Sequence, residues 1–209
     1  MSLFCLFFVP AFYVFRRDSL SEEKSAFPEP GVISGFILGL IAAFIRFSWG
    51  ELFSLRGYGF AAFAVQLIDG APYDALLPIA CYAFLRRFGR PRRRFDETEA
   101  VNFSLAWLVP ICALRSIYWS SVPDPVRLVI IPILFVSLAV SFPHWIRKAL
   151  DEYGLSQAIA IIVVVLSPLT VAGVSWAFFT HRPIFGLVFF CAACAVSIPP
   201  MVPLFKSIR

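Results

Sequence analysis

Long apolar stretches, separated by short charged links, are the feature that most constrains the fold of this chain. Seven stretches have the composition of membrane helices, which need about 20 apolar residues. They cover residues 1–15, 31–49, 60–84, 101–119, 127–146, 157–180 and 183–204. Such continuous runs do not fit a transmembrane β-barrel, whose strands alternate apolar and polar residues. We therefore expect an all-α integral membrane protein, with residues 1–209 forming a single polytopic domain of about seven transmembrane helices.

Charged residues are too scarce to cover a water-facing surface. They make up 15% of the chain and hydrophobic residues 60%, whereas soluble domains carry about 25% charged residues. This composition excludes a soluble globular domain, and it excludes a disordered chain as well. The links between the stretches are too short to hold a separate catalytic or receptor domain.

The basic residues predict the orientation of the chain. Thirteen of the 18 Lys and Arg residues fall in alternate links or at the C-terminus, which the positive-inside rule assigns to the cytoplasm, with the N-terminus outside. The densest link contains Arg86, Arg87, Arg90, Arg92, Arg93 and Arg94. These residues serve either as a topology determinant alone or as contacts for anionic lipid headgroups. Since they lie next to membrane spans, we expect the lipid bilayer and no nucleic acid as their partner.

The third stretch contains the main candidate site. Gln66, Asp69 and Tyr73 share one helix face at spacings of three and four residues, and Asp74 follows. Acidic residues inside a span are costly and are functional candidates, although Asp69 followed by glycine and proline is also a turn signal that would split the helix. The alternative is structural, with Asp69 capping a helix end and Asp74 paired with an arginine. We expect Arg115, near the outer end of the fourth stretch, to be the basic partner at this site.

Other chemistries find little support in the sequence. The two histidines, His144 and His181, are too few for a haem or a histidine-based zinc site. Cys191 and Cys194 have the spacing of a redox pair, but they lie inside the last stretch, where helix packing explains small residues better. We expect no cofactor and no metal. The proline-rich sequence from Ile198 to Pro203 predicts the end of the last helix.

Several short patterns occur in order along the chain. An aromatic and basic segment ends in Asp18, an acidic-proline link around Glu29 follows, and a glycine-containing span comes next. Later come Phe95, Asp96 and Glu97 at the entry to the fourth stretch, and Gly173 in the sixth. In this order of patterns the chain resembles the PrsW family of intramembrane proteases. That family belongs to the superfamily of the CAAX-processing proteases and the gamma-secretase scaffold subunit.

The active-site motifs of that family are missing from this chain. At the positions of the family's Glu-Glu-x-x-Lys motif, this chain keeps a single carboxylate, that of Asp74. At the positions of the family's Glu-Asn pair, this chain has Arg115 and Ser116. The two family histidines fall on Val136 and Ala172, while His144 is eight residues away from the first of these positions. The resemblance therefore implies a degenerate, inactive member. It also implies a bacterial cytoplasmic membrane as the location.

Three functions remain open. The first is a non-catalytic scaffold or complex subunit that binds another membrane protein or a lipid-anchored segment. It is favoured by the lost motifs and by two faces of small residues: Gly35, Gly39, Ala42 and Ala43, and Ala192, Ala193 and Ala195. The second is a protease-like intramembrane enzyme that uses Asp69 and Asp74 as its catalytic pair. The third is a small transporter or channel with Asp69 as its ion or proton site.

Overall fold

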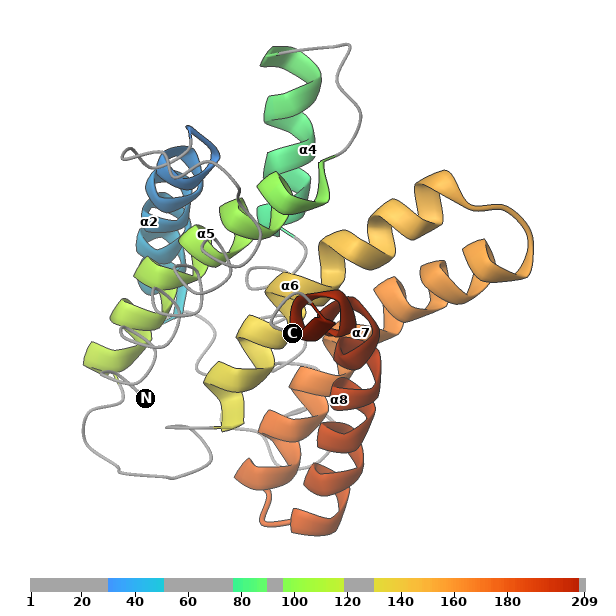
Figure 1. Cartoon of the computed structure of the whole chain (residues 1–209). Coiled ribbons are helices and arrows are strands. Elements are labelled where there is room, and N and C mark those ends of the chain that lie inside the picture. Colours follow the sequence, from blue (N-terminus) through green and yellow to red (C-terminus); the bar gives the residue numbers. More distant parts are fainter. Residues whose placement is uncertain (1–29, 51–76, 90–95, 119–129, 207–209) are drawn as a thin grey trace.

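The computed structural model describes residues 30–50, 77–89, 96–118 and 130–206, and in these ranges every regular element is a helix (Figure 1). In chain order the helices are α2 (Pro30–Gly50), α4 (Leu77–Gly89), α5 (Glu97–Tyr118), α6 (Ile131–Asp151), α7 (Leu155–Phe179) and α8 (Pro183–Lys206). The predicted all-helical class is thus confirmed for the part of the chain that the structure describes.

The helices follow the predicted stretches closely. α2, α7 and α8 match residues 31–49, 157–180 and 183–204 to within two residues at each end, while α5 begins and α6 ends four to five residues beyond the prediction. The first predicted stretch and most of the third lie outside the described residues. By length and composition, one described segment, Leu155–Val174 in α7, suffices to cross a membrane. Gly31–Ile45 and Pro183–Pro199 are shorter apolar helices.

α2 lies directly on α5, and two glycines set the distance between them (Figure 1). A Cβ atom on Gly35 would lie 2.5 Å from the carbonyl oxygen of Phe103, and one on Gly39 would lie 2.5 Å from that of Trp107. Ala42 and Ala43 are buried in the same cluster as these aromatic residues. The small-residue face of α2 is therefore occupied by α5 of the same chain. Our reading of this face as a surface for a partner protein was wrong.

α6 is the central helix of the group formed by α6, α7 and α8. It packs against α5, α7 and α8, and α7 and α8 pack against each other. Its buried residues Leu134, Leu138 and Phe142 share one apolar core with Leu105 of α5 and Val174 of α7. The end of α6 and the start of α7 extend away from the other helices as a hairpin (Figure 1).

The last helix does not end at its prolines. α8 continues through Pro199, Pro200 and Pro203 to Lys206, so the proline-rich sequence is part of the helix, whose last described residue lies two positions beyond the predicted stretch. For one carbonyl of this region, a side chain replaces the backbone partner that proline removes. The indole Nε1–H of Trp145 donates to the carbonyl oxygen of Val196 over 2.9 Å.

His181 belongs to the turn between α7 and α8. Its φ of 55° is left-handed, and the N–H of Arg182 donates to the carbonyl oxygen of Ala177 over 2.7 Å. This is the long hydrogen bond of a Schellman motif, which ends a helix with one left-handed residue. The Arg182 guanidinium also lies 5.8 Å from the centre of the Trp176 ring. The turn therefore accounts for His181 structurally.

Candidate functional site

The residues of the sequence-predicted site lie outside what the structure describes. Gln66, Asp69, Tyr73 and Asp74 precede the first described residue of α4, and Arg115 is on α5 with its side chain outside the described set. The same holds for the side chains of the arginine-rich link at residues 86–94. These assignments stay predictions.

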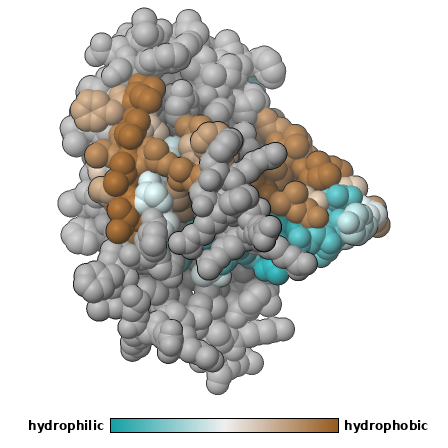
Figure 2. All heavy atoms as spheres, turned by 90° about the horizontal axis from the view of Figure 1, so that it is seen from above, coloured by the Kyte–Doolittle hydropathy of each residue, from teal (hydrophilic) through white to brown (hydrophobic). Residues whose placement is uncertain are grey.

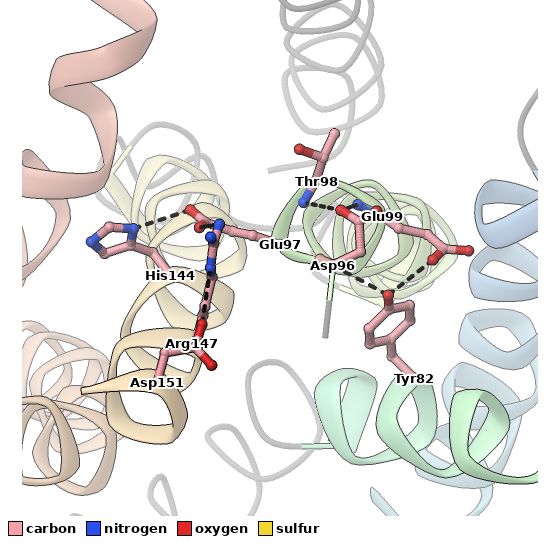
Figure 3. Close-up of polar contacts among 8 residues, drawn as sticks. All are labelled: Tyr82, Asp96, Glu97, Thr98, Glu99, His144, Arg147 and Asp151. Atoms are coloured by element: carbon pink, nitrogen blue, oxygen red, sulfur yellow. Dashed lines mark hydrogen bonds and ion pairs between the residues drawn. The ribbon is translucent and has the colours of Figure 1, made fainter. Parts of the chain in front are cut away.

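The described residues form a different polar site, at the N-terminus of α5 (Figure 3). Asp96 caps this helix, because its Oδ1 accepts the backbone N–H of Thr98 over 3.0 Å and that of Glu99 over 3.3 Å. Aspartate is a preferred N-cap, and acidic residues in the first helical turn interact favourably with the helix dipole. The local sequence therefore starts the helix here, and the capping orients the side chains that follow.

Glu97 links α5 to the end of α6. Its Oε1 lies 3.1 Å from His144 Nδ1, and its Oε2 lies 3.3 Å from Arg147 Nη1. The hydrogen bond from His144 lowers the pKa of Glu97 below its ordinary value, and attraction by the charges of His144 and Arg147 adds to this, while partial burial opposes it. An ionised carboxylate can only accept hydrogen bonds, so Nδ1 of His144 carries the proton.

Glu99 points to the opposite side of α5 (Figure 3). The Tyr82 hydroxyl of α4 lies 3.0 Å from its Oε2 and 3.3 Å from the carbonyl oxygen of Asp96. On the α2 side, a Cβ atom on Gly31 would lie 3.2 Å from Glu99 Cγ. The first turn of α5 therefore contacts the start of α2, the middle of α4 and the end of α6. We call Tyr82, Asp96, Glu97, Glu99, His144 and Arg147 the α5 polar cluster.

The end of α6 carries two further ion pairs of its own and one hydrogen bond to α7. Arg147 Nε lies 3.4 Å from Asp151 Oδ2, and Lys148 Nζ lies 3.9 Å from Glu152 Oε2. The Gln157 side chain of α7 donates to the carbonyl oxygen of Ala149 over 3.0 Å. The Gln157 hydrogen bond therefore joins α7 to α6 across the hairpin.

The chemistry open to the α5 polar cluster is limited by its pairing. A carboxylate that orients an imidazole is also part of hydrolytic triads, but the contacts of residues 96–118 and 130–206 place no Ser, Cys or further carboxylate at Nε2 of His144. A carboxylate with a lowered pKa is also a weak general base at neutral pH. Within the described ranges, no three His, Cys, Asp or Glu residues are grouped to hold a metal ion. The geometry is that of a structural contact that joins α5 to α6 and to α4.

Comparison with known proteins found no matching family model, no matching curated protein and no matching solved structure. The PrsW resemblance therefore rests on the sequence patterns alone. At the two positions that correspond to the family histidines, Val136 and Ala172 are buried. The Asp96–Glu97 pair of the resemblance lies in the α5 polar cluster.

The pairing of Glu97 with His144 was not predicted from the sequence. The two residues are 47 positions apart, and no local pattern connects residues at such a separation. One indirect signal was present. The predicted topology places the start of the fourth stretch and the end of the fifth on the same side of the membrane, so polar residues at these two ends could have been expected to meet.

Proposed function

We propose that this chain is an integral membrane protein that acts as a non-catalytic scaffold or complex subunit, binding another membrane protein or a lipid-anchored segment. The observation that carries the proposal is the apolar surface of the long helices. Exposed apolar side chains occur on α2 (Ile33, Phe36, Ile37, Leu40, Ile41, Phe44, Ile45), α7 (Ile159, Ile161, Ile162, Val165, Leu166) and α8 (Ile184, Phe185, Leu187, Val188, Ile198). A surface of this kind requires lipid or a protein partner to cover it.

The distribution of polar and apolar side chains agrees with this proposal. In Figure 2, brown apolar surface covers much of the described area, and brown and teal occupy opposite sides of the part at the right, where the α6–α7 turn lies in Figure 1. Polar residues thus gather near a helix-connecting turn, whereas the helix shafts are apolar. This is the distribution that a bilayer favours.

The contacts between helix ends support the predicted topology. The start of α2 and the end of α6 meet the first turn of α5 through Gly31, Glu99, Glu97 and His144. Tyr82 contacts the same turn from the middle of α4, two residues before the end of the predicted stretch 60–84. The positive-inside assignment places the start of α2, the start of α5, the end of α6 and the end of the stretch 60–84 in the cytoplasm. Contacts among them are therefore expected for a bundle that crosses the membrane repeatedly with its N-terminus outside.

The scaffold part of the proposal is supported by the pairing within the α5 polar cluster. Glu97 is held by two basic side chains and Glu99 by Tyr82, so these carboxylates join helices of the same chain. The resemblance to the PrsW family, with its active-site motifs replaced, supports the same conclusion and a bacterial cytoplasmic membrane. Arg86, Arg87, Arg90, Arg92, Arg93 and Arg94 would face anionic lipid headgroups on the cytoplasmic side.

Gentle detergent extraction of the tagged chain from its native membrane tests the proposal. We expect one other membrane protein to copurify at a fixed stoichiometry, and the same partner to copurify with Asp69→Asn and Asp74→Asn variants. Recovery of the chain alone would contradict the scaffold function. Loss of the cellular phenotype in Asp69→Asn, with normal expression and normal partner recovery, would instead indicate an enzyme or a transporter.

A further inference from the structure

The proline pair in α8 removes the α-helical partners of two backbone carbonyls, those of Ala195 and Val196, and the carbonyl of Val196 loses its 3₁₀ partner as well. In an α-helix the carbonyl of Val196 accepts the N–H of residue 200, and in a 3₁₀ turn it accepts that of residue 199. Both positions are proline, which has no N–H. α8 nevertheless continues as a helix on both sides of this pair.

Trp145 of α6 supplies the missing donor. Its Nε1–H lies 2.9 Å from the Val196 carbonyl oxygen, and the residue is only 8% exposed. The indole N–H is a donor with no acceptor role, so it matches a carbonyl that lacks a partner. The contact joins the side chain of one helix to the backbone of another.

The position of Trp145 is itself held by its neighbours on α6. The His144 ring packs edge-on against the Trp145 ring at a centroid distance of 5.6 Å, and Lys148 Nζ lies 5.5 Å from the centre of the ring. His144 in turn contacts Glu97 of α5. Trp145, which donates to α8, therefore packs against the same histidine that joins α6 to α5.

We propose that Trp145 is a latch on a proline hinge in α8. Helices bend sharply where proline interrupts their hydrogen bonding, and a few such positions can absorb the dihedral changes of a hinge motion. With the Trp145 hydrogen bond made, α8 runs as one helix through the proline pair to Lys206. When the bond is broken, the pair Pro199 and Pro200 lets this end of α8 change direction.

Hydrogen exchange on the purified full-length chain in detergent tests the latch. The backbone N–H groups of Met201 and Val202 report on the hinge, because their helical acceptors, Ser197 and Ile198, precede the proline pair. Trp145→Phe removes the donor and keeps an aromatic ring. We expect exchange at Met201 and Val202 to become about three- to tenfold faster, the effect of losing one net hydrogen bond, while amides in the first half of α8 keep their rates.

Pro200→Ala provides the matched control, because it restores an N–H that the Val196 carbonyl can accept. In that background we expect Trp145→Phe to change the exchange rates by less than about twofold. Pro200→Ala should also recover the thermal stability that Trp145→Phe loses. Unchanged exchange in Trp145→Phe would overturn the proposal. Equal acceleration in both backgrounds would also overturn it, because the effect would then come from lost packing.

Discussion

Glu97 is the residue that joins α5 to α6 by charge. Its carboxylate faces His144 and Arg147 in the structure, and its side chain is 25% exposed, so solvent screens the pairing only in part. Arg147 is 53% exposed and contributes less, because exposed ion pairs are worth little. The stability that Glu97 provides therefore comes mainly from its hydrogen bond with His144.

The lowered pKa of Glu97 predicts a pH dependence of stability. A carboxyl group whose pKa is lower in the folded state stabilises that state above its unfolded pKa, about 4.3, and this contribution disappears as the pH falls through the folded value. We expect Glu97→Gln to lose about 1 kcal/mol at pH 6 and to show less destabilisation between pH 5 and pH 3 than the wild type, since it has no carboxylate to protonate. Thermal unfolding in detergent at a series of pH values measures this.

Asp151→Asn is the matched control for Glu97→Gln. Asp151 also contacts Arg147, but as an exposed pair within one helix, so its loss should change stability by less than about 0.5 kcal/mol. The same pH profile in wild type and Glu97→Gln would show that Glu97 does not contribute this pH dependence.

At the scale of helices, three glycines in α2 face α5 at a spacing of four residues. Gly35 and Gly39 approach the backbone of α5, whereas Gly31 approaches the flexible side chain of Glu99. Backbone cannot move aside without shifting the helix, but a glutamate side chain can rotate. Although all three glycines lie on the same face, they should therefore tolerate a methyl group differently.

Alanine substitutions in α2 test this difference. We expect Gly39→Ala to destabilise the protein by about 1–3 kcal/mol, as overpacking does, because the new Cβ would lie 2.5 Å from the Trp107 carbonyl oxygen. Gly31→Ala should be neutral or slightly stabilising, since alanine has the higher helix propensity, by up to about 1 kcal/mol. Thermal unfolding temperatures of both variants give the comparison. Equal losses in the two variants would show that the close approach of α2 to α5 does not set the stability.

At the scale of the whole molecule, the environment of the apolar surface decides what a charge on it costs. Ile162 is 55% exposed near the middle of the segment Leu155–Val174, and Leu155 is 78% exposed at its start. In water a polar substitution at either site would change stability by about 0.5 kcal/mol or less. In a bilayer the central position is costly and the terminal one is not.

Lysine substitutions in α7 distinguish the two environments. We expect Ile162→Lys to reduce the amount of protein integrated into membranes, because a lysine at the centre of a span costs about 2.5–3.5 kcal/mol. Leu155→Lys should integrate normally, since its side chain can reach the membrane interface. Carbonate extraction of membranes followed by quantification of the pellet measures integration. Normal integration of Ile162→Lys would contradict a transmembrane position for α7.

Patterns within single segments predicted most of the helices. Apolar runs predicted α2, α7 and α8 to within two residues at each end, because helix formation in such runs depends on neighbouring residues. The same local patterns do not show how α8 continues through its prolines. Proline removes a local hydrogen bond, and the replacement comes from Trp145, 51 positions away from Val196.

The sequence by itself determined the helical class and the position of the charged links, since both follow from composition and short-range periodicity. Only the tertiary structure decided which polar groups meet: Glu97 with His144, Tyr82 with Glu99, and Trp145 with the carbonyl of Val196. It also decided that the glycines of α2 contact α5. The physical reason is that these contacts depend on how separate helices pack and how their ends align, and no local pattern specifies the distance between residues so far apart in the chain.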